Sequence, residues 1–509
     1  VGQTNAGKRF APKAAVFEVV LAVSVDDAAA GATPDLVGNL MKFRSENSAG
    51  QAISLRDQLD FAIAPLPPVA LVKGISRITP AVPPGSPAQD VNPPADDPAD
   101  VDGRTVRDGD VVQFRIDLSN TSDTLPPGYA SSVRGLDVWD KLPLGVPCDS
   151  VTNPDPSSGT GVTFSCLDPT DAGYPTAGGS GRSLLRWVFD DSDTQAINAG
   201  ARRTLTYDFT VPQNVSVALS LTDDAGVRSY QAFTNLPGVA ATYYPASNID
   251  ASVPVADQDA PRADDSSNVV VENVALTKTG ATAITESNNN TPNQATIGEE
   301  VTYTVTATVP YGTSVYRGVL TDTLPPGLDY VSATADYSVD AGATWSTTLP
   351  AGTGLANAGQ AVTLTLPTTY TAAADKTIDH VFRVVITARV STIAGNAQGV
   401  SRNNIVRFQS KSADSDAAAN VTAPQQRNYR VTVVEPAPTL TKVAGASEVA
   451  AGDTVTYTLT ASNAVGRPPL LDSWVIDCVP AGLLFQGYLP SARSDVLPSA
   501  SVPHRSATT

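Results

Sequence analysis

Histidine, cysteine and methionine are scarce in this sequence. Its 509 residues include two histidines, three cysteines and one methionine. So few thiols exclude a disulfide-rich scaffold and a thiolate metal site. His380 and His504 lie near no nucleophile motif and at no metal-ligand spacing. The sequence therefore predicts no hydrolase, no metalloenzyme and no cofactor, and we expect His380 in TIDHVF to begin a strand.

Excess positive charge and long apolar runs are also missing. The formal net charge is −18, with 33 basic and 51 acidic side chains, and no Lys/Arg cluster offers a footprint for a phosphate backbone. No apolar run approaches the roughly 20 residues of a membrane helix, and the first residues have no signal-peptide pattern. We expect neither nucleic-acid binding nor membrane insertion by this segment, and we expect any export signal and anchor to lie outside it.

Strand-forming and turn-forming residues dominate what is present. Runs rich in Thr, Val and Tyr alternate between apolar and polar side chains, and clusters of Pro and Gly separate them. This pattern predicts an all-β chain of tandem immunoglobulin-like antiparallel β-sandwich domains. A chain of this length is expected to hold about three or four units.

Three short patterns recur in a fixed order. An apolar strand ends in lysine at Lys73, Lys278 and Lys442. A glycine and an acidic residue then open an alternating strand in GDVVQF, GEEVTY and GDTVTY. Next, a strand ends in aspartate and enters a proline turn at Asp140, Asp322 and Asp477. Ordered internal repetition of this kind indicates repeated domains.

A strand headed by asparagine comes late in the first three units, at Asn39, Asn235 and Asn404. The order of the patterns sets four predicted domains. Residues 1–65 are expected to be the C-terminal part of a truncated sandwich, and residues 436–509 the N-terminal part of another. Residues 66–272 are expected to form a complete sandwich with insertions, and residues 273–435 a second complete one. Short Pro-bearing linkers are expected to hold the units in an extended row.

The use of lysine favours a chemical interpretation. The chain has nine lysines, and three of them occupy the same repeat position. They are either solvent-facing lysines that protect edge strands or members of an isopeptide site with Asp and Asn from other strands. In such a site the lysine amine attacks the asparagine carbonyl and ammonia leaves. Burial would keep the amine neutral and the aspartic acid protonated, so that the acid can shuttle protons.

Four strings carry a family resemblance: LTKTG, GEEVTYTVT, LTDTLPPGLDYV and NNIVRF. They resemble the isopeptide-forming domains of Gram-positive pilins and collagen-type adhesins, and the "domain of unknown function eleven" repeats of bacterial surface proteins. The resemblance covers nearly the whole chain and is strongest at 273–435. It implies a cross-link from Lys278 to Asn404 with Asp322 as proton shuttle.

The same resemblance implies a second cross-link, from Lys73 to Asn235 with Asp140 as proton shuttle. In the other unit Asn403 adjoins Asn404, and the register shared with Asn39 and Asn235 favours Asn404, because a slip of one residue reverses the face of a strand. Denaturing mass spectrometry is therefore expected to show the loss of one ammonia for each complete unit.

Both ends of the chain hold incomplete sites. No asparagine-headed strand of the repeated pattern follows Lys442 and Asp477, and no lysine or aspartate at the repeated positions precedes Asn39. Truncation of a longer protein explains this arrangement, and strand exchange between neighbouring molecules is an alternative.

Cysteines and acidic residues in the second predicted domain leave further alternatives open. Cys148 and Cys166 bracket a loop and form either a local disulfide or two buried thiols, and Cys478 has no obvious partner. The acidic segment 96–103 contains oxygen ligands but lacks the spacing of a calcium loop, so a disordered acidic insertion is expected there.

These patterns predict a structural stalk or shaft segment of a bacterial cell-surface adhesin or fimbria-like protein. It would be secreted, extracellular and not an enzyme, apart from single-turnover bond formation. A ligand-binding adhesin domain at 66–272 and a subunit of an extracellular filament or sheath are the alternatives. The expected partners are a host or cell-surface ligand and neighbouring copies of the chain.

Overall fold

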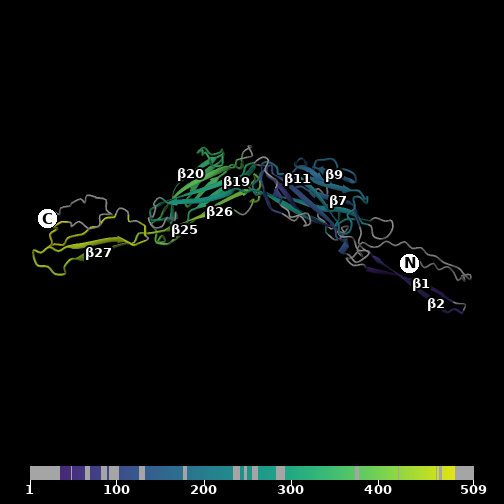
Figure 1. Cartoon of the computed structure of the whole chain (residues 1–509), viewed down its shortest axis with the longest axis horizontal. Helices are drawn as coiled ribbons and strands as arrows, with labels where there is room; N and C mark the ends of the chain where they lie inside the picture. Colours follow the sequence, from purple (N-terminus) through teal and green to yellow (C-terminus); the bar gives the residue numbers. More distant parts are fainter. Residues whose placement is uncertain are drawn as a thin grey trace.

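The structure is a computed structural model. It describes residues 35–46, 49–63, 69–81, 89–90, 102–124, 132–175, 180–232, 241–245, 249–250, 252–254, 262–282, 293–372, 378–421, 424–465, 467–468, 470 and 473–487. Within these residues, strands are joined by turns and by short 3-10 helices at Ser122–Thr124 and Cys148–Ser150. Figure 1 shows two β-sandwiches side by side along the long axis, with a pair of strands at each end.

The first sandwich consists of two sheets. One has the strand order β4 (Gln89–Asp90), β3 (Val69–Thr79), β6 (Val111–Asn120), β11 (Arg202–Thr210) and β8 (Val151–Asp155). The other has the order β5 (Arg104–Val106), β15 (Asp264–Val271), β13 (Ser220–Ala232), β7 (Val133–Lys141), β10 (Leu184–Phe189) and β9 (Val162–Leu167), and β14 (Ala241–Tyr243) pairs with β13.

The second sandwich repeats this plan. One sheet has the order β16 (Ala275–Thr282), β18 (Glu300–Val309), β24 (His380–Val390) and β20 (Leu328–Ser338). The other has the order β17 (Gln294–Ala295), β26 (Gln425–Val433), β25 (Ser401–Lys411), β19 (Thr313–Thr323), β22 (Ala361–Thr365) and β21 (Gly354–Ala358), and β23 (Thr369–Thr371) and β12 (Val215–Ser216) pair with β19. The prediction of an all-β chain of immunoglobulin-like sandwiches is confirmed, and His380 begins β24 as expected.

Period-two alternation builds the two cores. Along β18, buried residues alternate with partly exposed ones over its whole length, so one face of the strand packs inward while the other faces solvent. Trp187 and Phe114 are fully buried in the first core, and Tyr303 and Phe382 in the second. Burial of such apolar area is the main force that holds each sandwich together.

The glycine–acidic pattern forms the same turn three times. The glycines have a positive φ, a conformation that favours glycine because it has no Cβ, and they are Gly109, Gly298 and Gly452, with φ of 76°, 87° and 95°. The acidic side chain that follows accepts a hydrogen bond from the backbone N–H three residues earlier, in Asp110, Glu299 and Asp453. The expected turn before each alternating strand is therefore present.

The two sandwiches are joined more closely than linkers alone would allow. Strand β12 follows β11 of the first sandwich in sequence, yet it pairs in parallel with Thr313 and Ser314 of the second, and Val217 is buried in the second core. Arg107 forms ion pairs with Glu272 and with Asp379, the latter at 3.2 Å. Sequence patterns predicted separate units in a row. In the structure, β12 follows a strand of the first sandwich and adds to a sheet of the second.

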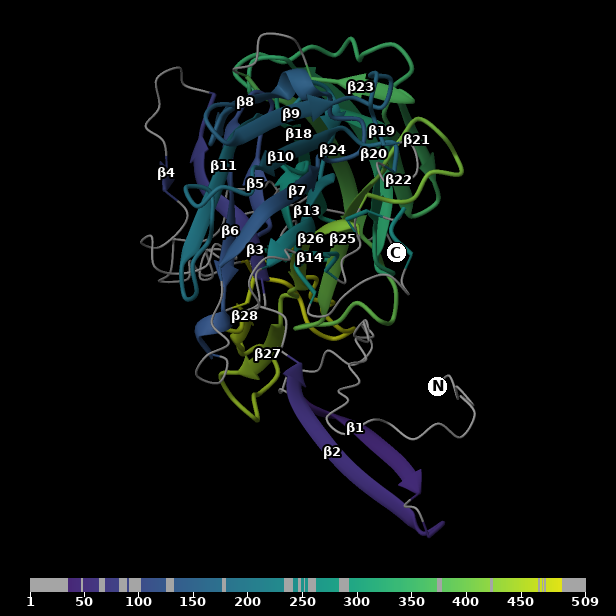
Figure 2. The same ribbon diagram turned by 90° about the vertical axis from the view of Figure 1, so that its right-hand side faces the viewer.

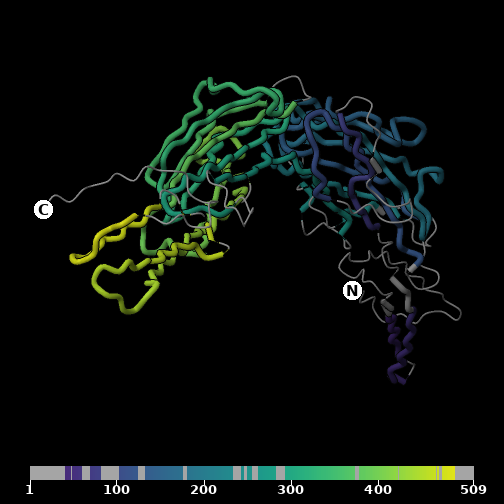
Figure 3. Tube along the Cα trace, turned by 60° about the vertical axis from the view of Figure 1, so that its left-hand side comes forward, coloured from purple at the N-terminus to yellow at the C-terminus, as the bar shows by residue number. Residues whose placement is uncertain are grey.

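The strand pairs at the two ends consist of β1 (Asp35–Glu46) with β2 (Ala52–Ile63), and β27 (Pro438–Ala444) with β28 (Tyr457–Asn463). They expose residues that a complete sandwich would cover. Leu440 is 60% exposed, whereas Leu71 and Leu276, at the same position in the two sandwiches, are 7% and 2% exposed. Figure 2 shows the β1–β2 pair projecting clear of both sandwiches, and Figure 3 shows that the sandwiches together form an arch.

Candidate functional site

The lysines of the repeated pattern point into the two sandwiches. Lys73 is fully buried, and the Lys278 side chain has no exposed surface. Register fixes this direction, because Lys73 lies opposite Ile116 and Lys278 opposite Val305, both on the core-facing side of the neighbouring strand. A role as solvent-facing protectors of strand edges does not fit this burial, since a charged ammonium avoids low-dielectric surroundings unless it is paired.

In the second sandwich, Lys278 on β16 contacts Asp322 on β19, in the opposite sheet. Burial raises the pKa of Asp322, although the nearby Lys278 opposes the rise. Burial also lowers the pKa of Lys278, although Asp322 opposes that shift. Both shifts favour the neutral forms, an amine and a carboxylic acid, which are the forms that an amine attack on an amide requires.

Asn404 completes this group. It is fully buried on β25 and lies beside Asp322, where it opposes the rise in the pKa of that carboxyl. Neither polar atom of its side chain makes a hydrogen bond of ordinary geometry to any residue that the structure describes, and the same is true of Asp322 Oδ1. A buried carboxamide without partners is disfavoured by about 1–3 kcal/mol. The burial of Asn404 therefore does not stabilise the fold while its side chain remains unmodified.

Asn403, the neighbouring alternative, points the other way. Its Oδ1 accepts a hydrogen bond from Asn428 Nδ2 at 2.8 Å on the exposed side of the sheet. Alternation along β25 therefore sends Asn404 into the core and Asn403 outward.

An aromatic ring lies beside each repeated lysine, a neighbour that the sequence patterns did not predict. The distances from lysine Nζ to ring centroid are 5.0 Å for Lys73 and Phe114, 4.9 Å for Lys278 and Tyr303, and 4.5 Å for Lys442 and Tyr457. Each ring belongs to the last residue of the glycine–acidic pattern, so the signal was present in GDVVQF, GEEVTY and GDTVTY. Such a ring lies against the lysine amine and attracts it when it is protonated.

The first sandwich places a different set around its lysine. Lys73 Nζ donates to Asp140 Oδ1 and to the Tyr207 hydroxyl, at 2.5 and 2.9 Å, and lies 2.9 Å from Asp223 Oδ1. Tyr207 in turn donates to Asp223 Oδ2 at 2.5 Å. All four side chains are fully buried. Lys73 and Asp140 thus meet as the sequence predicted, whereas no sequence pattern pointed to Asp223.

The pKa values of the two carboxyls move apart. Burial and the negative charge of Asp223 raise the pKa of Asp140 well above its usual range. Burial acts on Asp223 in the same direction, but the Lys73 charge and hydrogen bonds from Asp140 and Tyr207 outweigh it and lower the pKa of Asp223. The raised pKa of Asp140 favours its protonated form and the lowered pKa of Asp223 favours its ionised form, the expected behaviour of two carboxyls in one buried site.

The predicted partner Asn235 lies outside the described residues. Among the described residues, the position equivalent to Asn404 is taken by Asp223. Asp322 lies opposite Val406, two residues after Asn404, and Asp140 lies opposite Ala225, two residues after Asp223. The first sandwich thus has an acid where the second has an amide.

The incomplete sites at the ends are only partly assembled. Lys442 Nζ contacts Asp477 Oδ1 at 2.7 Å, and the two side chains are 41% and 33% exposed. The backbone of Asn39 pairs with Leu59 in β1–β2, and its side chain is outside the described part of the structure. Cys478 is a free, exposed cysteine.

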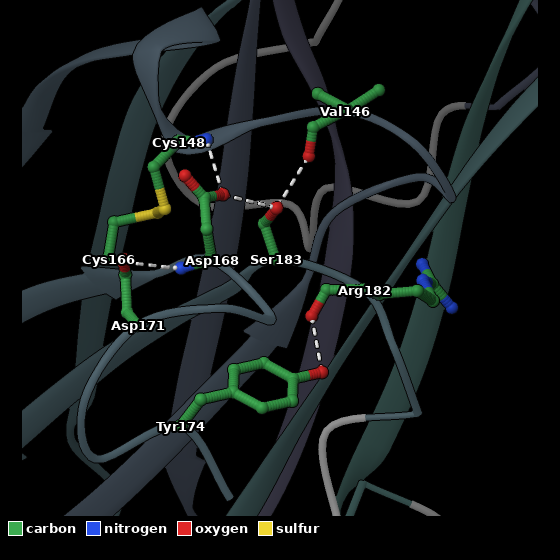
Figure 4. The surroundings of a disulfide bond; sticks show 8 residues. All are labelled: Val146, Cys148, Cys166, Asp168, Asp171, Tyr174, Arg182 and Ser183. Atoms are coloured by element: carbon green, nitrogen blue, oxygen red, sulfur yellow. Dashed lines mark hydrogen bonds between the residues drawn. A yellow bond between two sulfur atoms is a disulfide. The ribbon is translucent and has the colours of Figure 1, made fainter. Parts of the chain in front are cut away.

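Cys148 and Cys166 form a disulfide, the first of the two alternatives that the sequence left open. Figure 4 shows the hydrogen bonds around it. Asp168 Oδ1 accepts from the Cys148 backbone N–H at 2.9 Å and from the Ser183 hydroxyl at 2.7 Å. The disulfide joins the 3-10 helix Cys148–Ser150 to the edge strand β9.

The described residues contain no group of three or more His, Cys, Asp and Glu side chains that could hold a metal ion. Most of the acidic segment 96–103, the weak calcium candidate, lies outside them. The described part of the chain also contains no helix long and apolar enough to cross a membrane.

No protein-family model matches this sequence, and no curated protein matches it. Among solved structures, the chain is similar to the C-terminal domain of the AgI/II polypeptide BspA of Streptococcus agalactiae, at 10% identity and a TM-score of 0.25, over 71% of this chain and 99% of that one.

The chain is also similar to the collagen adhesin of Staphylococcus aureus and to the pilus backbone RrgB of Streptococcus pneumoniae. The first likeness has 9% identity and a TM-score of 0.20, over 71% of this chain and 93% of that one. The second has 12% identity and a TM-score of 0.22, over 38% and 48%.

Proposed function

We propose that this chain is a shaft segment of a bacterial cell-surface adhesin or fimbria-like protein, and that an isopeptide bond between Lys278 and Asn404 locks its second sandwich. The observation that carries the proposal is the buried Asn404 side chain, which has no ordinary hydrogen bond among the described residues and lies beside a buried Lys278–Asp322 pair. A reaction that consumes this carboxamide removes the penalty of burying it unpaired.

The pKa shifts of Lys278 and Asp322 favour the forms that the reaction needs. The neutral Lys278 amine attacks the side-chain carbonyl carbon of Asn404, and protonated Asp322 polarises the carbonyl oxygen. Asp322 then moves a proton from Lys278 Nζ to the amide nitrogen of Asn404. The bond from that nitrogen to carbon breaks, ammonia leaves, and a neutral secondary amide joins the two strands. Each site reacts only once, so this is a single-turnover reaction and not enzymatic catalysis.

The position of the bond suits a load-bearing role. It ties β16, the first strand of the second sandwich, to β25, near its end, across the two sheets. Force applied to the chain ends would then pass through the bond and bypass the folded strands between. The shared strand β12 supports the same role, because it couples the sandwiches in series.

The Cys148–Cys166 disulfide supports an extracellular location, since disulfides persist in oxidising compartments. A host ligand and a filament of neighbouring copies stay predictions.

Single-molecule pulling on the whole chain tests the proposal. With the bond in place, the roughly 126 residues between Lys278 and Asn404 cannot extend. The Lys278→Ala variant should therefore release about 400 Å more chain, at about 3.3 Å per residue. Lys411→Ala is the matched control, because Lys411 lies at the end of β25, away from the site. Equal release from the wild type and Lys278→Ala would contradict the proposal.

A further inference from the structure

Asp223 occupies the position of a reactive partner in the first sandwich. It lies two residues before the residue opposite Asp140, as Asn404 does relative to Asp322. Its Oδ1 is 2.9 Å from Lys73 Nζ, and both side chains have no exposed surface. Sheet register and direct contact therefore single out the same residue, independently of each other.

The neighbouring acid shows that this placement is specific to Asp223. Asp224 is the next residue on β13 and forms an ion pair with Arg182, with 40% of its side chain exposed. Alternation sends one aspartate to the lysine and the other toward solvent. The sequence SLTDDAG thus carries two adjacent acids, of which one faces the buried amine.

We propose that the first sandwich carries its own covalent cross-link, an amide between Lys73 Nζ and Asp223 Cγ, formed by loss of water with Asp140 as the acid–base. This extends the proposed cross-linking to a second site with a carboxylic acid as the acceptor. It assigns Asp223, and not Asn235, as the partner of Lys73.

The step balances within the cluster. One proton passes from the Lys73 ammonium to the Asp223 carboxylate, which it contacts, and leaves an amine and a carboxylic acid. The amine attacks Asp223 Cγ while protonated Asp140 donates to the carbonyl oxygen. Asp140 then moves a proton from Nζ to the Asp223 hydroxyl, the carbon–oxygen bond breaks, and water leaves. The proton on the carbonyl oxygen returns to Asp140 as the amide forms. No oxidant or activated intermediate is needed, and Asp140 ends in its starting form.

Burial supplies the driving force for amide formation. In water, an ammonium and a carboxylate are stabilised by solvation and do not condense. In this cluster both are removed from water, where an ion pair recovers its desolvation penalty only with excellent geometry. The product replaces two buried charges by one neutral amide. Tyr207 donates to Asp223 Oδ2, and this hydrogen bond holds the carboxyl in place against the amine, so Tyr207 is a positioning residue.

Peptide mass spectrometry of the whole chain after trypsin digestion tests the inference. A cross-linked Lys73 resists cleavage, so residues 57–77 should appear joined to residues 204–228 in one branched peptide whose mass is short by one water. Fragmentation of that peptide should place the branch at Asp223. Separate, linear peptides of full mass from the wild type would overturn the inference.

The variant Asp223→Asn offers a sharp chemical comparison. It should cross-link with loss of ammonia, so that its mature branched peptide has the same mass as that of the wild type although the two chains differ in sequence. Asp140→Asn should abolish the branched peptide, and Asp224→Asn, the matched control, should keep it. A branched peptide in Asp223→Asn but not in the wild type would show that only an amide reacts, and would overturn the inference.

The same digest separates this result from the proposed function. The peptides that contain Lys278 and Asn404 report the second sandwich on their own. Linkage there without linkage at Lys73 would overturn the Asp223 assignment and leave the shaft proposal standing.

Discussion

Replacement of Asn404 by alanine distinguishes a cross-linked second sandwich from an unlinked one, because the change in stability should have opposite signs in the two cases. If no bond forms, the variant removes a buried carboxamide that has no ordinary hydrogen bond among the described residues. Removing such a group gains about 1–3 kcal/mol, offset in part by a small cavity. The expected change is then close to neutral or stabilising.

If the bond forms, the same variant opens a loop of roughly 126 residues between Lys278 and Asn404. Treated like a disulfide, closure of a loop of this length stabilises the fold by about 5 kcal/mol through the entropy of the unfolded chain. For a domain of this size, each kcal/mol shifts the melting temperature by about 2–4 °C. We therefore expect Asn404→Ala to lower the melting temperature of the second sandwich by about 10–20 °C.

Differential scanning calorimetry of the whole chain measures this shift. The control is Asn403→Ala, because Asn403 lies on the same strand and faces outward, and a surface substitution of this kind should change stability by about 0.5 kcal/mol or less. An unchanged or raised melting temperature for Asn404→Ala would refute the reasoning, since a cross-link cannot be lost without a large destabilisation.

Three further predictions concern other parts of the molecule. Replacing Cys148 and Cys166 with alanine should destabilise the first sandwich by about 3 kcal/mol, given a separation of 18 residues, and leave the second transition in calorimetry unchanged; an equal shift of both would contradict separate cores. Tyr303→Phe should still cross-link in mass spectrometry, because the Tyr303 hydroxyl has no hydrogen bond among the described residues and Phe114 fills that place in the first sandwich, whereas loss of the bond would give the hydroxyl a role in the reaction. Arg107→Ala should broaden the distribution of distances between spin labels on the two sandwiches, because it removes the ion pair with Asp379 that crosses their joint; an unchanged distribution would assign the joint to β12 alone.

Local sequence patterns were sufficient to predict the strands and the lysine–aspartate pair of each sandwich. Alternation and turn residues predicted the sandwiches. The fixed order of the patterns predicted that Lys73 contacts Asp140 and that Lys278 contacts Asp322. These features depend on periodicity and on turn chemistry, which act over a few residues.

The partner of Lys73 could not be found in the same way. Asn235 heads a run that looks like the strand of Asn404, whereas Asp223 lies in SLTDDAG, where an acid is ordinary on a solvent-facing strand. Only the pairing of β13 with β7 shows which of the two adjacent aspartates faces the lysine. Such pairing joins residues far apart in sequence, so it leaves no local signal.

The joint between the sandwiches was missed for a related reason. Strand β12 has two residues, Val215 and Ser216, and it pairs across the boundary rather than within its own sandwich. A strand this short has no periodicity to detect, and its partner edge exists only once the second sandwich has folded.

Intact mass spectrometry of the whole chain under denaturing conditions tests the central claim most directly. Sequence patterns alone predicted the loss of two ammonia molecules. With an acid at Asp223 and an amide at Asn404, the account now predicts a mass short by one water and one ammonia, with Lys73→Ala restoring the water and Lys278→Ala restoring the ammonia. A mass equal to that of the unmodified chain would contradict the account.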